Sequence, residues 1–280
     1  MTHTQTYGVE NIEETVNGGI VRPLKIGWRS IHKDIQLVQE HFRNVKDYER
    51  WKQGVEQAER SNIHFETITP TTEFFQKFYP FYVQQISSIE GGRIALPENW
   101  LDLHKEKDEE VIAYTAHAGE TLVGGMLAFV DAKLGALHVS FLAINHEHHG
   151  VTPGLQHQLL QDLIKRKLSW IYYGKDTNLY GLALSPGLVF NKIRFGLEPF
   201  IPEGVPIVHS FFITKPEKLP VFCYALDEAK QLPYLYILAE SSTEAFKQYA
   251  SSGIDRVEVH AAQEVVNEHA AAFNTLVSQA

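Results

Sequence analysis

The chain has 280 residues, of which 44% are hydrophobic and 21% charged, with a formal net charge of −9. This composition excludes a disordered or collagen-like chain and is sufficient for one large domain or two smaller ones. The single cysteine, Cys223, excludes an intramolecular disulfide and a thiolate zinc cluster. Because neither a signal peptide nor an apolar run of about 20 residues is visible, we expect a cytoplasmic protein with no membrane partner.

The first third of the chain predicts helices joined by short extended segments. Thr71 and Thr72 before Glu73 predict a helix start, because threonine hydroxyls cap free N–H groups and a carboxylate favours the positive end of a helix. The expected elements are, in order, a loose arm over 1–20, a helix over 35–57, a strand over 64–68, a helix from 71, an irregular helical segment over 84–104 and a charged loop over 105–110.

The middle of the chain changes to a period of two, which is typical of strands. Three strands over 111–117, 121–130 and 136–143, joined by short turns, predict an antiparallel meander. Thr152 as N-cap and Pro153 at the first helical position predict a long helix, whose leucines recur at three-to-four spacing. A strand over 170–173 follows.

The rest of the chain predicts a short helix and then an appended segment. The expected elements are a loop and helix over 181–195, strands over 198–201 and 207–213, and a tail with strand 234–239, helix 243–251, strand 256–259 and helix 263–278. We therefore expect an N-terminal arm, helix and strand over 1–68, a core over 69–215 and a C-terminal α/β subdomain over 216–280.

Two short motifs carry a resemblance to a known family. The run Trp170-Ile-Tyr-Tyr-Gly174 is followed by Gly187-Leu-Val-Phe-Asn-Lys-Ile-Arg-Phe-Gly-Leu-Glu-Pro199. With the element order around them, they resemble the GNAT superfamily of acyltransferases, and more narrowly its Fem-like branch. The resemblance implies an α/β fold of GNAT type, a mixed and mostly antiparallel central sheet flanked by helices, here with an appended C-terminal β-α-β-α segment.

The loop before the long helix is where the resemblance implies contact with the phosphates of a donor. Acetyl-CoA users normally have an Arg/Gln-x-x-Gly-x-Gly/Ala pattern there, whereas this chain reads His146-Glu-His-His-Gly-Val-Thr-Pro-Gly-Leu155. Pro153 removes one of the amides that would face an anion. The residues expected to hold the donor are His149, Gly150, Thr152, Gly154 and Leu155.

The histidines of that loop also suggest a metal, since His-x-His-His spacing can place two imidazoles on one ion. No cysteine or aspartate joins His146, His148, His149 and His157 nearby. We therefore expect no metal cofactor.

His138 is the candidate general base. Strand alternation predicts that His138 and Ser140 share one face, while Leu137, Val139 and Phe141 take the other. In the fold implied by the resemblance, this strand borders the site where the acceptor amine meets the donor, so His138 would remove the amine proton and Ser140 would contact substrate. A core histidine bonded to a backbone carbonyl is the alternative interpretation.

The same resemblance implies functional roles for further residues. It implies that Lys192 contacts the donor phosphate or the oxyanion of the tetrahedral intermediate. Tyr173 is the candidate acid that returns a proton to the leaving group. The alternative interpretation is that Tyr173 only packs against other aromatic side chains. Glu90 and Arg93, in the connection between helices, are expected to hold the ammonium and carboxylate of an amino-acid-like acceptor.

Three functions remain open on the sequence. The first is an N-acyltransferase that moves an acyl group from acyl-CoA or an acyl-carrier thioester to the amine of a small molecule or peptide. Its candidate partner is an acyl carrier protein, and its candidate assembly is a homodimer. The second is a Fem-like transferase that uses charged tRNA, which the charge of −9 disfavours. The third is a catalytically silent GNAT-like binding module. This function would be favoured if side chains such as Phe141 or Tyr172 filled the space between residues 138 and 173.

Overall fold

The computed structural model describes residues 9–12, 20–23, 27–89, 92, 94–173, 180–183, 187–200, 207–212, 219–227, 232–241 and 256–279. They belong to two compact units, and each unit is built from separate stretches of the chain. The first comprises residues 28–174 and 194–198, and the second comprises residues 1–27, 175–193 and 199–280. The predicted helix over 243–251 and the predicted site residues Glu90 and Arg93 lie outside the described residues.

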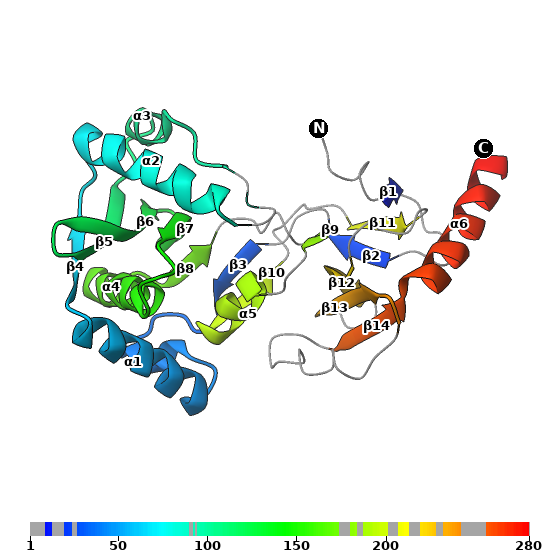
Figure 1. The fold of residues 1–280 in the computed structure, drawn as a ribbon, viewed down its shortest axis with the longest axis horizontal. Coiled ribbons are helices and arrows are strands. Elements are labelled where there is room, and N and C mark those ends of the chain that lie inside the picture. Colours follow the sequence, from blue (N-terminus) through cyan, green and yellow to red (C-terminus); the bar gives the residue numbers. More distant parts are fainter. Residues whose placement is uncertain are drawn as a thin grey trace. The chain divides into compact units, whose positions relative to one another are not determined.

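A seven-stranded sheet organises the first unit (Figure 1). Its strands, in spatial order, are β10 (Leu197–Phe200), β3 (Gly27–Ser30), β8 (Trp170–Tyr173), β7 (Ala136–Ile144), β6 (Thr121–Asp131), β5 (Val111–Ala118) and β4 (Ile63–Ile68). Strands β4 to β7 pair antiparallel, which confirms the predicted meander, whereas β7 and β8 pair parallel. This mixed, mostly antiparallel sheet with its flanking helices is the GNAT-like fold expected from the sequence.

Helices cover both faces of this sheet. Its helices are α1 (Val45–Arg60), α2 (Thr72–Ser87), α3 (Trp100–Lys105) and α4 (Val151–Arg166), with the short 3-10 helix η2 (Val38–His41) before α1. Helices α2 and α3 cover one face, where the buried rings of Phe75, Phe78 and Trp100 pack on Ala113 and Leu127. Helices α1 and α4 cover the opposite face (Figure 1).

Local capping explains where two of these helices begin. The Thr71 hydroxyl accepts a hydrogen bond from the Phe74 N–H at 3.1 Å, which confirms the predicted start of α2. At α1 the cap is Asn44, whose side chain accepts from the Asp47 N–H at 2.9 Å, so this helix begins later than the sequence suggested. The preceding residues form η2 instead.

The start of α4 differs from the prediction. The N-cap is Gly150, with a left-handed φ of 83°, and the helix begins at Val151. The prediction of Thr152 as N-cap and Pro153 as first helical residue was therefore wrong by two positions. The physical reason is the contact with α1: a Cβ on Gly150 would come within 2.4 Å of the Gly54 carbonyl oxygen.

The second unit contains two further sheets. Strands β1 (Val9–Ile12) and β2 (Ile20–Pro23) flank β11 (Ile207–Phe212), and β14 (Val257–Ala261), β13 (Leu232–Ala239), β12 (Val221–Asp227) and β9 (Tyr180–Ala183) form the other sheet. Helix α5 (Gly187–Arg194) belongs to this unit up to Ile193, and α6 (Ala262–Gln279) packs Val265 and Val266 on Tyr236 and Leu238. The arm predicted over 1–20 thus contains strand β1.

Close packing of α4 on the sheet yields a first prediction. A Cβ at Gly154 would lie 2.0 Å from the Phe65 ring of β4. We expect Gly154→Ala to lower the free energy of unfolding by about 1–3 kcal/mol, as overpacking in a core does. Chemical denaturation measures it, and the same substitution in a Phe65→Leu background is the control. A loss of the same size in both backgrounds would contradict this contact as its cause.

A buried histidine yields a second prediction. His41 of η2 is completely buried between the rings of Phe195 and Phe42, with centroids at 4.6 and 5.5 Å. Burial lowers its pKa from the ordinary value near 6.5 to about 3. The unfolded chain therefore binds this proton first as the pH falls, so stability is full above about 6.5 and declines from there towards pH 3.

We expect His41→Leu to flatten the dependence of the melting temperature on pH between 6.5 and 4. The exposed His146 provides the control variant His146→Gln, which should keep the slope of the unmodified protein. Equal slopes for all three proteins would show that the protonation of His41 does not contribute to acid unfolding.

Candidate functional site

His138 lies in the middle of a stack of rings on the α2 and α3 face of the sheet. It is opposite Phe129 of β6 and in register with Tyr172 of β8. The ring centroids are 4.8 Å from Phe129 and 4.9 Å from Tyr172, with interplanar angles of 17° and 15°. Because rings cover both faces of the imidazole, only the edge of His138 is available for chemistry.

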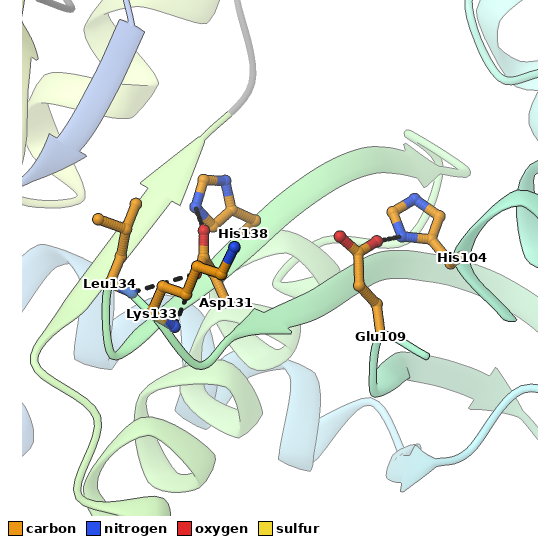
Figure 2. A network of polar contacts seen from close by, with 6 residues as sticks. All are labelled: His104, Glu109, Asp131, Lys133, Leu134 and His138. Atoms are coloured by element: carbon orange, nitrogen blue, oxygen red, sulfur yellow. Dashed lines mark hydrogen bonds and ion pairs between the residues drawn. The ribbon is translucent and has the colours of Figure 1, made fainter. Parts of the chain in front are cut away.

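Asp131 lies at one edge of this imidazole (Figure 2). Its Oδ2 is 3.7 Å from Nε2 of His138, while its Oδ1 accepts the N–H groups of Lys133 and Leu134 at 3.0 and 3.1 Å. The turn between β6 and β7 therefore holds the carboxylate in place. Nε2 is buried and has no hydrogen-bond partner among the described residues, so a proton on Nε2 would face Asp131.

The electrostatics of His138 favour its neutral form. Burial lowers the pKa of His138, and the charges of Asp131 and Glu109 oppose this effect. With Nε2 directed at the carboxylate, Nδ1 is the nitrogen that would accept a proton. An imidazole that is neutral near pH 7 and has a carboxylate at its second nitrogen has the chemistry of a general base.

Asp131 was not among the predicted site residues. The sequence places it at the first position of the turn 131–135, and an aspartate at such a position commonly bonds the backbone two residues ahead. That role is observed here, and it accounts for only one oxygen of the carboxylate. The sequence did contain a signal for this contact. Residues 131 and 138 lie on either side of the predicted turn between two strands, so pairing of these strands brings them close together.

A second pair of histidine and carboxylate lies on the other side of Phe129. The His104 ring of α3 is 4.7 Å from Phe129, and its Nδ1 is 2.5 Å from a carboxylate oxygen of Glu109 (Figure 2). The Glu109 N–H donates to the His104 carbonyl oxygen, so the loop after α3 folds back on this residue. On the sequence, residues 105–110 were expected only to form a charged loop.

The β7 strand contains an irregularity that corrects the predicted faces. Ala128 pairs with Val139 and Leu127 pairs with Phe141, so Ser140 is an extra residue in a bulge. Phe141 packs on Tyr82 and Trp100, on the face that also carries His138. The prediction that Phe141 takes the opposite face was wrong, because the bulge shifts the alternation by one residue.

Tyr173 is not brought together with His138. It follows Tyr172 on a short strand, so its side chain points to the opposite face, where it contacts Phe195 and lies beside Gln156 of α4. Burial raises the pKa of its phenol, which keeps the group protonated. The structure therefore separates Tyr173 and His138 by the thickness of the sheet.

The residues predicted to hold a donor phosphate divide into two groups. Gly154 lies against Phe65 and Leu155 is completely buried, so these two belong to the core between α4 and the sheet. His149 is exposed and Thr152 is half-buried at the first turn of α4, and Gly150 supplies the left-handed cap. Only His149 and Thr152 keep side chains at the surface of this helix start.

Lys192 lies on α5 and is 8% exposed, whereas its neighbours Asn191 and Arg194 are exposed. A buried ammonium is rare and indicates a specific environment. The structure assigns Lys192 to the second unit and His138 to the first, and their joint action remains a prediction.

Within the described ranges, no group of three or more His, Cys, Asp or Glu side chains is arranged to hold a metal ion. No helix in the described part of the chain is both long and apolar enough to cross a membrane.

No protein-family model and no curated protein matches the chain. Among solved structures, an L-PGS from Bacillus licheniformis is 12% identical with a TM-score of 0.47, over 68% of this chain and 61% of that chain. A conserved protein of unknown function from Bacteroides thetaiotaomicron is 10% identical with a TM-score of 0.44, over 67% and 62%. The PaiA N-acetyltransferase from Thermoplasma acidophilum, in complex with coenzyme A, is 12% identical with a TM-score of 0.37, over 52% and 98%.

This chain spans less than two thirds of the length of the first two of these structures. All three likenesses have TM-scores below 0.5 and identities far below 25%, so no activity, substrate or partner is transferred from them. The assignment of the fold rests on the order and pairing of the elements in this chain.

Proposed function

We propose that the protein is an N-acyltransferase that moves an acyl group from a CoA or carrier thioester to an amine acceptor. The observation that carries the proposal is the carboxylate of Asp131 at the edge of the His138 imidazole, with Oδ2 3.7 Å from Nε2. His138 lies in the part of β7 that pairs parallel with β8, from Ala136–Trp170 to Val139–Tyr173. The GNAT resemblance implies that the thioester of the donor lies beside these two strands, near His138.

The geometry of His138 supports the role of general base. The acceptor nitrogen attacks the thioester carbonyl carbon while Nδ1 of His138 removes its proton, and Asp131 at Nε2 stabilises the resulting imidazolium. The C–S bond then breaks, and the sulfur takes up the proton held by His138, so that charge and protons balance. The ring stack fixes the plane of the imidazole and so orients Nδ1.

The donor would extend along β7 from the start of α4. A strand rises about 3.3 Å per residue, so His138 and Ile144 lie about 20 Å apart. We propose that His149 and Thr152 meet the phosphate end of the donor, where the amides of a helix start favour an anion. Glu90, Arg93 and Ser140 remain candidates for contact with the acceptor.

A second candidate function is a binding module without catalysis. The observation that favours it is the contact of Tyr172 with His138, which fills part of the space that a substrate would need. A Fem-like reaction with charged tRNA is the other donor chemistry, and the charge of −9 weighs against it. An acyl carrier protein partner and a homodimer also remain predictions.

Calorimetric titration with acetyl-CoA and longer acyl-CoAs, followed by an acyl-transfer assay on a panel of amines, tests the proposal. We expect binding and turnover, and a loss of about 10²-fold to 10⁴-fold in kcat for His138→Gln, as removal of a general base produces. His146→Gln is the matched control for a histidine outside the stack.

Heat of binding without turnover would support the binding module. Neither heat nor a thermal shift with any acyl-CoA would contradict the CoA donor, and salt-dependent retention of charged tRNA on filters would then support the Fem-like donor.

Lys192 yields a separate prediction. If its buried ammonium stabilises the donor or the oxyanion, Lys192→Met should lower turnover by about 10²-fold, and Lys192→Arg should restore it only in part. Circular dichroism at the assay temperature verifies that each variant is folded. The expected loss is about 10²-fold. If folded Lys192→Met instead keeps its turnover within about twofold of the unmodified protein, Lys192 has no part in the mechanism.

A further inference from the structure

The pair formed by His104 and Glu109 has no role in the mechanism described above, although only the ring of Phe129 lies between His104 and His138. Four rings follow one another across α3, β6 and β7. The centroids are 4.3 Å apart from Trp100 to His104, 4.7 Å from His104 to Phe129 and 4.8 Å from Phe129 to His138. His104 and His138 therefore pack on opposite sides of one phenyl ring.

Glu109 is held in place by His104 at two points. Nδ1 of His104 is 2.5 Å from its carboxylate, and the His104 carbonyl oxygen accepts its N–H. The His104 side chain is 10% exposed and the Glu109 side chain 29% exposed, so this carboxylate is only partly surrounded by water. A charge in such a position acts over a longer range than a fully solvated one.

The titratable groups that face His138 come from three directions. Asp131 approaches from β6, and Glu109 with His104 from α3 and the loop that follows it (Figure 2). Tyr172 stacks on the imidazole from β8. Two carboxylates thus act on one imidazole, and both favour its protonated form. Burial between the rings opposes them.

We propose that His104 and Glu109 are positioning residues for His138: His104 fixes the Glu109 carboxylate behind Phe129, and Glu109 shares with Asp131 the stabilisation of the His138 imidazolium. The catalytic meaning of this inference rests on the proposed acyl transfer, since the imidazolium forms when His138 takes the proton of the acceptor. The electrostatic coupling itself does not depend on any reaction.

The test is an NMR titration of the His138 ring in the full chain, with chemical shifts followed against pH. Glu109→Gln keeps an oxygen that accepts a hydrogen bond from His104 and removes only the charge. We expect the pKa of His138 to fall in this variant, because the imidazolium loses a nearby opposite charge. Glu110→Gln is the matched control, because Glu110 is the next residue and pairs with Arg166 at 2.7 Å instead.

A second variant, His104→Phe, keeps a ring against Phe129 and removes the nitrogen that holds Glu109. It should lower the pKa of His138 in the same direction, by a smaller amount. Folding of each variant is verified from the same spectra. An unchanged pKa of His138 in folded Glu109→Gln would overturn the coupling, and an unchanged pKa in folded His104→Phe would overturn the positioning role of His104.

Where turnover is measurable, the acid limb of its pH profile should move with the NMR pKa in Glu109→Gln and stay fixed in Glu110→Gln. A purely structural role of Glu109 would lower the melting temperature without moving this limb, and that result would overturn the proposal. Failure to find any acyl-transfer activity would affect the proposed function, whereas the titration would still decide the coupling.

Discussion

The parallel pairing of β7 and β8 is the constraint on which the rest of the first unit depends. Two parallel neighbours cannot be joined by a tight turn, so the chain must cross one face of the sheet before it returns. Helix α4 is that crossing, and its close approach to β4 and α1 at Gly154 and Gly150 leaves no room for a side chain at either position. The glycines expected to surround a phosphate thus serve helix packing.

The same pairing determines the surroundings of His138. A residue in the middle of three paired strands has a neighbour on each side at nearly fixed spacing, and here both neighbours are aromatic. The stack therefore follows from strand register, and the bulge at Ser140 lies just beyond it. Up to the bulge, β7 is paired with β6 on one side and β8 on the other, which fixes the position of the ring.

Much of the first unit follows from local sequence signals. The meander, the start of α2 at Thr71 and the strand over 170–173 depend on neighbouring residues, and the structure contains all of them. Strands β1 and β2 were not predicted, because their partner β11 lies almost 200 residues away and no local pattern records that pairing. The start of α4 at Gly150 likewise depends on a contact with Gly54 in another helix.

The candidate site was predictable to a similar extent. His138 could be chosen from its residue type and strand, but Asp131, Glu109 and His104 acquire their positions only when the hairpin closes and α3 packs on Phe129. The assignment of Tyr173 failed to account for strand alternation, since adjacent residues of a strand cannot share a face. Pairwise geometry across strands is the information that a linear pattern lacks.

The stack also limits the chemistry that His138 can perform. An imidazole covered on both faces can exchange a proton along its edge, but a covalent intermediate on nitrogen would require a substrate in the plane of the ring, between Phe129 and Tyr172. The carboxylate of Asp131 already occupies the side of Nε2, which leaves a single direction of approach at Nδ1. Proton removal needs only that one direction, whereas nucleophilic attack needs space for an acyl group as well. Proton exchange along the ring edge at Nδ1 is therefore the chemistry that the geometry of this histidine fits best.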